Sequence, residues 1–425
     1  MAMDLSKHPC FNKDAKGSCA RIHLPVAPKC NIQCNYCNRK YDCVNESRPG
    51  VTSSVLTPAQ AILYMEKVLE AEPRITVVGI AGPGDPMANA KQTLETMRRI
   101  KDKWPDMILC LSSNGLELAE HVDELAEIGV SHVTVTVNAI DLDVAEKIYS
   151  WARVGKVLYR GREAARILLE RQEESIRRLK EKDLIVKINT IIIPGVNDHH
   201  IEAIAAKMKS MGVNLLNCMA IIPNKDTKFE HIIEPNKDDV EAIRAMAEGY
   251  LPQMRHCQRC RADAVGLLEK DCSRQFSGLL SACAADKSAG LDASRPHVAV
   301  ASMEGMLVNM HLGEAGGFQI WGEDGAGGYK LVETRPAPAA GTGPKRWYEL
   351  AKSLSDCRAA LVSGVGDTPQ AILEEEGVKV VAMSGFITQG LDAVYKTGDI
   401  ERLRAKGGGG CKMGSGCTGG GEGCG

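Results

Sequence analysis

The stretch that decides the fold is Cys30-Asn31-Ile32-Gln33-Cys34-Asn35-Tyr36-Cys37, which has the form C-x3-C-x2-C. With 16 cysteines among 425 residues, about 0.02 such triplets are expected by chance, so the spacing is a strong signal. Three thiolates on one short loop can bind three irons of a [4Fe-4S] cube, which leaves the fourth iron open to another ligand. The alternative, three buried loop cysteines without a metal, is disfavoured by the spacing.

The segments around this motif alternate between strands and helices. Strands are predicted at 21–26, 75–80, 107–112, 131–137, 184–193 and 213–222, and helices at 58–70, 89–102, 116–128, 162–182 and 198–211. Thr57 is a suitable N-cap, and Pro58 suits the first position of its helix. This alternation predicts a parallel sheet that is covered on both faces. We therefore expect an α/β fold with a partial (βα)6 barrel, in which ligands bind at the carboxyl ends of the strands.

Composition narrows the class of function. A hydrophobic share of 44% is ordinary for a globular protein, no apolar run approaches a membrane span, and the chain opens without a secretory signal, so we expect a cytoplasmic protein with no membrane partner. The net charge of -2 offers no basic field for nucleic acid. Sixteen cysteines in a reducing compartment indicate metal or redox chemistry in place of disulfides.

The cysteine motif resembles that of the radical S-adenosylmethionine (SAM) superfamily. The resemblance implies that SAM chelates the open iron through its amino and carboxylate groups, and that one electron cleaves it to a 5′-deoxyadenosyl radical. The partial barrel predicted from the strand pattern is the fold of that superfamily. Two independent observations therefore agree.

Glycines and short polar side chains at the strand ends are candidates for binding SAM. The turn at 82–86 could bring its backbone close to the SAM amino group, with the Asp85 carboxylate as acceptor, although an ordinary tight turn is the alternative. Other candidates would contact the ribose, the carboxylate or the adenine. The full set is Gly82, Gly84, Asp85, Ser112, Asn114, Asn138, Asn189 and Ile221.

Further candidate metal ligands surround the mouth of the predicted barrel. Alternation along the strand places Cys110 on the same face as Ser112 and Asn114, which would make Cys110 a lumen cysteine. A satisfied core histidine is the alternative for His23. A C-x2-C pair such as Cys257 and Cys260 could by itself bind zinc. The remaining candidates are His23 on the first strand, Cys43 after the motif, and Cys10 near the amino terminus.

Beyond these motifs, the chain closely resembles the NifB family of nitrogenase cofactor biosynthesis proteins. The matching stretches are HPCF at 8–11, HLPVAPKCNIQCNYCNRKYDC at 23–43, NESRPG at 45–50, AGPGDP at 81–86 and CQRC at 257–260. The resemblance covers about residues 8–275 and implies three cube sites, one for SAM and two for precursor [4Fe-4S] clusters that fuse. It implies that one precursor is held by His23, Cys43 and Cys110, and the other by Cys10, Cys257 and Cys260. Glu46 could be a transient ligand, with a solvated loop carboxylate as the alternative.

The chemistry that this resemblance implies uses two SAM molecules. One donates a methyl group to a sulfide of a precursor, and the other supplies the radical that abstracts a methyl hydrogen. Further deprotonation leaves the carbon as the central carbide of an [8Fe-9S-C] cluster, with one additional sulfur from outside. His23, Cys43 and Cys110 would thus be catalytic residues of a radical SAM lyase or transferase of nitrogen fixation. Three labile ligands, one of them an imidazole, keep release of the product feasible. The implied partners are iron-sulfur cluster donors, an electron donor such as ferredoxin, and a carrier or scaffold protein of nitrogenase assembly.

The sequence also predicts a second domain. We expect a barrel domain with cluster-binding extensions at 1–285, a linker at 286–296, a smaller α/β domain at 297–406 and a mobile tail at 407–425. In the smaller domain, strands are predicted at 298–302, 306–311, 359–363 and 378–383, a helix at 345–356, and a Gly/Pro-rich loop between 311 and 345. The domain resembles the NifX/NafY-like family, which implies a ribonuclease H-like fold that binds nitrogenase cofactor clusters.

Two other functions compete with this interpretation. One is a different radical SAM enzyme whose auxiliary clusters serve an organic or peptide substrate. The other is a noncatalytic iron-sulfur carrier with static cysteine ligands. An open-site C-x3-C-x2-C disfavours the carrier, because a carrier has no use for an iron without a protein ligand.

Overall fold

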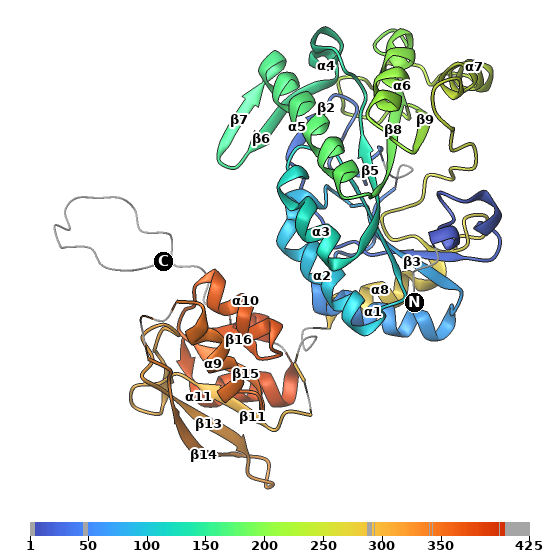
Figure 1. The fold of residues 1–425 in the computed structure, drawn as a ribbon. Coiled ribbons are helices and arrows are strands. Elements are labelled where there is room, and N and C mark those ends of the chain that lie inside the picture. Colours follow the sequence, from blue (N-terminus) through green and yellow to red (C-terminus); the bar gives the residue numbers. More distant parts are fainter. Residues whose placement is uncertain are drawn as a thin grey trace, which may run out of the picture. The chain divides into compact units, whose positions relative to one another are not determined.

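A computed structural model describes residues 5–45, 50–286, 291–292, 294–339, 341, 343–398 and 400–403, and the chain forms two compact units, Met1–Ala284 and Ala285–Gly425 (Figure 1). Glu46, the expected tail at 407–425 and part of the expected linker lie outside the described residues. Within the described ranges, no helix combines the length and the apolar character that crossing a membrane requires.

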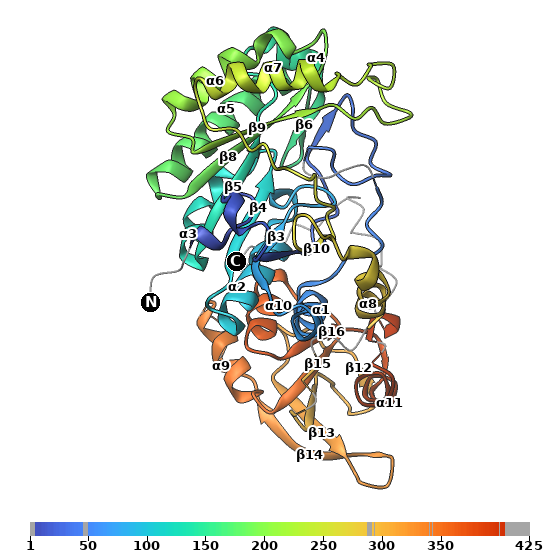
Figure 2. The same ribbon diagram turned by 90° about the vertical axis from the view of Figure 1, so that its right-hand side faces the viewer.

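The first unit is built on a seven-stranded sheet with the order β10-β1-β3-β4-β5-β8-β9 (Figure 2). Neighbours from β1 to β9 run parallel, and only the short edge strand β10 (Val265–Gly266) is antiparallel. This confirms the expected partial barrel of six parallel strands. These strands are β1 (Ala20–His23), β3 (Ile75–Ile80), β4 (Ile108–Ser113), β5 (Val130–Thr136), β8 (Ile185–Ile192) and β9 (Leu215–Ala220).

Helices pack on the outer face of this sheet because each presents an apolar stripe to it. The helix α1 begins as its sequence predicts, with a capping box between Thr57 and Gln60 and with Pro58 in the first turn. Its Met65 and Val68 are fully buried in one core with Val78 of β3. The helices of this unit are α1 (Pro58–Ala71), α2 (Ala90–Lys103), α3 (Val122–Ile128), α4 (Leu142–Ile148), α5 (Gly161–Glu181), α6 (Ile201–Ser210), α7 (Lys237–Glu248) and α8 (Ser273–Ala285).

A small antiparallel sheet that the sequence analysis did not predict supports the cysteine motif. It consists of β2 (Ile32–Cys34), β6 (Tyr149–Val154) and β7 (Val157–Arg160). The strand β2 has only three residues and owes its conformation to pairing with β6, more than a hundred residues later in the chain. Local sequence patterns do not report such a partner, which is why this segment was expected to be a loop.

The second unit has a five-stranded sheet with the order β14-β13-β11-β15-β16. Its strands are β11 (His297–Val300), β13 (Gly317–Glu323), β14 (Tyr329–Pro336), β15 (Cys357–Val362) and β16 (Lys379–Ala382), and β12 (Leu307–Val308) pairs separately with β17 (Gly385–Phe386). Its main helices are α9 (Lys345–Ser353), α10 (Asp367–Glu375) and α11 (Ile387–Asp392). Both hydrophobic cores of this unit consist of its own residues.

One prediction for this unit is wrong. The segment between 311 and 345 is not a Gly/Pro-rich loop, because it contains the hairpin of β13 and β14. Three of its glycines lie in the hairpin turn, where Gly325 and Gly327 adopt φ values of 82° and 90° that other residues rarely adopt. The Asp324 carboxylate accepts hydrogen bonds from the backbone of Ala326 and Gly328 and closes that turn.

Candidate iron-sulfur and SAM sites

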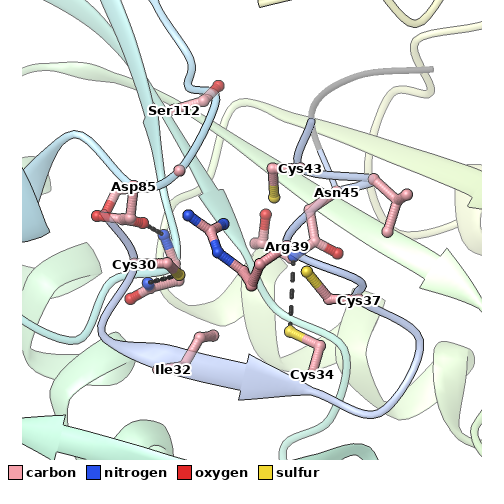
Figure 3. A pocket seen from close by; sticks show the side chains of 14 residues that line it. Cys30, Ile32, Cys34, Cys37, Arg39, Cys43, Asn45, Asp85 and Ser112 are labelled. Carbon is pink, nitrogen blue, oxygen red and sulfur yellow. Dashed lines mark hydrogen bonds between the residues drawn. The ribbon is translucent and has the colours of Figure 1, made fainter. Parts of the chain in front are cut away.

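The three motif cysteines line one cavity, which we call the triad cavity (Figure 3). It lies where β3, β4 and β5 end, the edge of a parallel sheet at which ligands usually bind. None of the described cysteines forms a disulfide bond. The residues that line this cavity are Cys30, Ile32, Cys34, Cys37, Arg39, Cys43, Val44, Asn45, Gly84, Asp85, Ser112, Ser113, Asn114 and Thr136.

The loop that carries the motif is held in shape by its own amides. The Gln33 side chain donates hydrogen bonds to the carbonyl oxygens of Cys34 and Cys37, at 3.0 and 2.7 Å. Side-chain amides also approach the sulfurs, since Asn45 Nδ2 lies 3.9 Å from Cys34 Sγ, and Asn114 Nδ2 lies 3.9 Å from Cys30 Sγ. These amides are suited to stabilise negative charge on the sulfurs.

Burial makes these thiols hard to ionise without a metal. It raises the pKa of Cys30 to about 12, with a further contribution from the nearby Asp85 carboxylate. Burial also raises the pKa of Cys34 and Cys37, while the Arg39 guanidinium opposes the effect at Cys37. A site of buried cysteines with no disulfide suits a group that brings its own positive charge, as iron does.

The arrangement fits a cube better than a single ion. Within the described ranges, no three His, Cys, Asp or Glu side chains gather closely enough to hold one metal ion. A [4Fe-4S] cube has no such need, because each thiolate binds a different iron and the ligands stand apart around it. In Figure 3 the sulfurs of Cys34 and Cys37 face Cys30 across the cavity. The residues present therefore fit a cube held by three thiolates.

Asp85 lines the triad cavity, but its carboxylate already has several partners within the chain. It accepts from the backbone nitrogens of Met87 and Asn114, at 2.9 and 2.6 Å, and from Ser113 Oγ at 3.1 Å. Its contacts tie the turn after β3 to the end of β4. We expected this carboxylate to accept from the SAM amino group, and its present contacts favour a role in holding Asn114.

In the same turn, the backbone at Gly84 lies very close to the segment that leads to the cysteine motif. A Cβ on Gly84 would lie 2.1 Å from the carbonyl oxygen of Lys29, the residue before Cys30. The Gly84 nitrogen donates to the Ala27 carbonyl at 2.6 Å. Gly84 is thus required where the turn meets the segment leading to the motif, whereas Gly82 does not line the triad cavity.

The other SAM-binding candidates divide into three groups, of which Asn189 alone lines only the second cavity described below. Ser112 and Asn114 line the triad cavity, whereas Asn138 and Ile221 are fully buried and line neither this cavity nor the one described next. The Asn138 amide donates to Tyr36 Oη at 2.7 Å and accepts from the backbone of Ile191. Direct contact of Asn138 or Ile221 with SAM therefore stays a prediction, and the present contacts of Asn138 favour a role in holding Tyr36 and the backbone of Ile191.

A second cavity, which we call the lumen cavity, occupies the interior of the barrel. Ser112 lines both cavities, so they adjoin at β4. Among the described residues that line the lumen cavity, none is an Asp or a Glu. These residues are His8, Cys10, Phe11, His23, Gly79, Ile80, Ala81, Cys110, Leu111, Ser112, Thr134, Lys187, Asn189, Asn217, Met219, Met254, Cys257, Gln258, Cys260 and Leu268.

His23 and Cys110 flank Gly79 in one row across the sheet, because β1, β3 and β4 pair in that register. A Cβ built on Gly79 would lie 2.9 Å from His23 Cδ2 and 3.1 Å from Cys110 Sγ. The His23 Nδ1 lies 3.0 Å from the Arg261 carbonyl oxygen, so Nδ1 donates and Nε2 keeps its lone pair. Burial and the nearby Arg21 lower the pKa of His23 to about 4, which keeps the ring neutral as a ligand must be. Cys43 lines the triad cavity instead.

Cys10, Cys257 and Cys260 all line the lumen cavity although they come from the two ends of the first unit. His256 Nε2 lies 3.0 Å from the Pro9 carbonyl oxygen and links the two segments. Burial raises the pKa of Cys10 to about 12, and the positive charge of Lys187 acts in the opposite direction. Like the triad, these thiols are suited to a cationic metal group.

Sequence analysis did not identify two residues that line the lumen cavity, Lys187 and His8, or Arg21, which contacts the lining residue Cys260. Lys187 lies two residues before Asn189 on β8, and Arg21 lies two residues before His23 on β1, so strand alternation could have placed each on the inner face of the sheet. His8 is 1% exposed, and its Nε2 has no hydrogen-bond partner within the described ranges. It is the first residue of the HPCF stretch at 8–11, in which only Cys10 was predicted to be a metal ligand.

Comparison with known proteins agrees with this geometry. The Radical SAM superfamily matches residues 24–208, and membership of that superfamily implies a [4Fe-4S] cluster and SAM as cofactors. The family "Dinitrogenase iron-molybdenum cofactor" matches residues 295–397. The FeMo cofactor biosynthesis protein NifB of Chlorobaculum tepidum is 47% identical over 405 residues, which are 95% of each chain. That of Klebsiella pneumoniae is 40% identical over 403 residues, 88% of this chain and 86% of the relative. Because these matches span nearly the whole chain, it belongs to the NifB family of FeMo cofactor biosynthesis proteins, within the radical SAM superfamily.

Proposed function

We propose that this chain fuses two [4Fe-4S] clusters and inserts a SAM-derived carbide, forming the [8Fe-9S-C] precursor of the nitrogenase cofactor. The observation that carries the proposal is the lumen cavity, in which His23, Cys110, Cys10, Cys257 and Cys260 share one space. That space adjoins the triad cavity at Ser112. Family membership supports the same function, since the curated relatives are FeMo cofactor biosynthesis proteins.

In this proposal Cys30, Cys34 and Cys37 hold the resident cube, which when bound supplies the electron for SAM cleavage. Ser112 and Asn114 then offer a hydroxyl and an amide to SAM beside the motif. Asp85 orients Asn114 by accepting from its backbone nitrogen at 2.6 Å. Asn189, from the lumen side, would contact the adenosyl moiety.

The substrate clusters would occupy the lumen. One would bind His23 and Cys110, with Cys43 reaching it from the triad cavity, and the other would bind Cys10, Cys257 and Cys260. Sharing one cavity lets two cubes meet without leaving the protein. The neutral His23 imidazole is a weaker anchor than a thiolate, which suits a precursor that must rearrange and depart. A precursor sulfide would receive the methyl group there, the 5′-deoxyadenosyl radical would abstract one hydrogen from it, and the other two would leave as protons to give the carbide. The ninth sulfur of the product would come from an outside sulfide donor, because two [4Fe-4S] clusters supply only eight.

The decisive experiment replaces Cys110 by Ala and uses Cys218→Ala as a matched control. Cys218 is buried on the strand β9 in the outer core, outside both cavities. Anaerobic reconstituted protein would be given SAM and dithionite, and 5′-deoxyadenosine, S-adenosylhomocysteine and the eight-iron product would be measured. We expect Cys110→Ala to cleave SAM but to form no eight-iron product, while Cys218→Ala forms it. Unimpaired product formation by Cys110→Ala would remove Cys110 from the site.

The same assay separates the competing functions. The absence of 5′-deoxyadenosine would favour a noncatalytic carrier. Deoxyadenosine without S-adenosylhomocysteine, and without an eight-iron product, would favour another radical SAM enzyme. Iron analysis gives a second criterion, because three cubes correspond to about twelve irons per chain and the resident cube alone to about four.

For the second unit, we propose a role in holding the product or docking the protein that carries it away. The match of residues 295–397 to the dinitrogenase iron-molybdenum cofactor family supports this role. Iron-sulfur cluster donors and a ferredoxin-like electron donor would then act on the barrel unit.

A further inference from the structure

Arg21 is a buried cation that the proposed chemistry does not use. It lies on β1, is 1% exposed, and points to the same face of the sheet as His23. Its Nε and Nη2 lie 3.4 and 3.3 Å from Cys260 Sγ. Two nitrogens of the guanidinium therefore donate hydrogen bonds to the sulfur of Cys260, one of the proposed cluster ligands.

The remaining contacts of Arg21 fix the guanidinium plane. Nη1 donates to the carbonyl oxygens of Gly266 and Leu267, and Nη2 lies 3.1 Å from the Asp271 carboxylate. A guanidinium is a rigid fork of donors, so these anchors decide where the two sulfur-directed N–H groups point. They point at Cys260, which lines the lumen cavity.

Hydrogen bonds of this kind change the properties of an iron-sulfur cluster. An iron-bound sulfur carries more negative charge than a thiol sulfur and is the better acceptor. Donors to ligand sulfurs and nearby positive charge set the reduction potential of a cluster, because both stabilise the more negative, reduced state. The burial of Arg21 strengthens this effect, since the water that would screen the charge is excluded.

We propose that Arg21 is a positioning residue for Cys260, holding its sulfur toward the lumen cavity and drawing negative charge from it. The substrate cluster bound there is then easier to reduce, and its bond to Cys260 is easier to break. When that bond breaks, the thiolate keeps the electron pair, the guanidinium balances its charge, and no electron or proton is transferred. The inference rests on the proposed second substrate site and deepens it.

A purely structural role is the competing explanation, because Arg21 also ties residues 266–271 to β1. Three substitutions separate the two roles. Arg21→Met removes the charge and the donors, Arg21→Lys keeps the charge without the fork, and Asp271→Asn weakens the anchor while keeping both N–H groups near the sulfur. Each would be compared in the full-length chain, anaerobically reconstituted with iron and sulfide.

The readouts are iron per chain, the thermal unfolding temperature, and the midpoint potentials of all clusters from a redox titration followed by electron paramagnetic resonance. We expect Arg21→Met to shift one potential to a more negative value or to lose about four irons selectively, with the triad cluster retained. Arg21→Lys should have a smaller effect in the same direction, and Asp271→Asn the smallest. In a Cys260→Ala background, Arg21→Lys should cause no further shift, because its effect passes through the sulfur.

Two outcomes would overturn the inference. Unchanged potentials and full iron content in both Arg21 variants would mean that the guanidinium does not act on a cluster. A lowered unfolding temperature with loss of every cluster in both variants would mean that Arg21 is only structural. If the unsubstituted chain itself held only about four irons, the proposed function would fail first, and that result is visible before any substitution is made.

Discussion

His132 on β5 is a buried histidine whose protonation the interior of the barrel disfavours. Its side chain is 1% exposed and packs against His8, with ring centroids 4.4 Å apart. Burial, with a further contribution from Lys187, lowers the pKa of His132 to about 4. The unfolded chain, with a pKa near 6.5 for this group, therefore binds the proton more readily than the folded chain does.

The pH dependence of stability follows from that difference. The contribution of His132 is intact above pH about 6.5 and is lost as the pH falls toward 4. From pH 7 to 4.5, we expect the wild type to lose about 2 kcal/mol more unfolding free energy than His132→Phe. Urea denaturation of the metal-free chain at both pH values measures this. The exposed residue His231, replaced by Gln, is the control, and parallel pH curves for wild type and His132→Phe would contradict the prediction.

Gly79, the second-last residue of β3, lies at a position where only a glycine fits without overlap. Any side chain there would enter the space between His23 and Cys110, and relieving the overlap costs about 1–3 kcal/mol. We expect Gly79→Ala to fold, to keep the triad cluster, and to lose about four irons as the first substrate site closes. Iron analysis and the spectrum of the SAM-bound cluster check this.

The matched control for that substitution is Gly278→Ala on α8, where no atom outside the adjoining residues and the backbone of the helix itself lies within 4 Å of the added carbon. Gly278→Ala should hold as much iron as the wild type, because it adds a methyl group in open space. Equal iron content in Gly79→Ala and Gly278→Ala would show that the row of His23, Gly79 and Cys110 does not bind a cluster.

At the scale of elements, the parallel strands were predictable and the small supporting sheet was not. Apolar runs such as Val77-Val78 and Ile191-Ile192-Ile193 are buried, so the composition of these strands identifies them. The strand β2 is stabilised by pairing with β6, and that partner cannot be found from local periodicity. The hairpin of β13 and β14 was missed for a related reason, since most of β14 is exposed and its turn is rich in glycine.

At the scale of the whole molecule, each unit has hydrophobic cores made of its own residues. A chain ending at residue 286 should therefore fold, hold the triad cluster and produce 5′-deoxyadenosine at close to the full rate. We expect its transfer of the eight-iron product to a nitrogenase-derived acceptor to fall, because the second unit is proposed to hold the product or dock the carrier. Transfer is measured as activation of cofactor-free nitrogenase extract.

The full-length chain with Ile233→Ala controls for nonspecific effects of altering and repurifying the protein. The Ile233 side chain is 84% exposed and lies outside both cavities. This variant should transfer product as the wild type does. Full-rate synthesis and transfer by the shortened chain would show that the second unit is dispensable for both steps.

The sequence alone determined the barrel and the open-site triad, because strand periodicity and cysteine spacing are local properties of the chain. It could name Asp85 and Asn138 as polar residues near strand ends, but not that their hydrogen-bonding groups are engaged within the protein. Only the tertiary structure decided that Cys10 and Cys260 share a cavity and that Arg21 reaches Cys260 across 239 residues of sequence. Such contacts depend on how distant segments close around the lumen, and no local pattern carries that information.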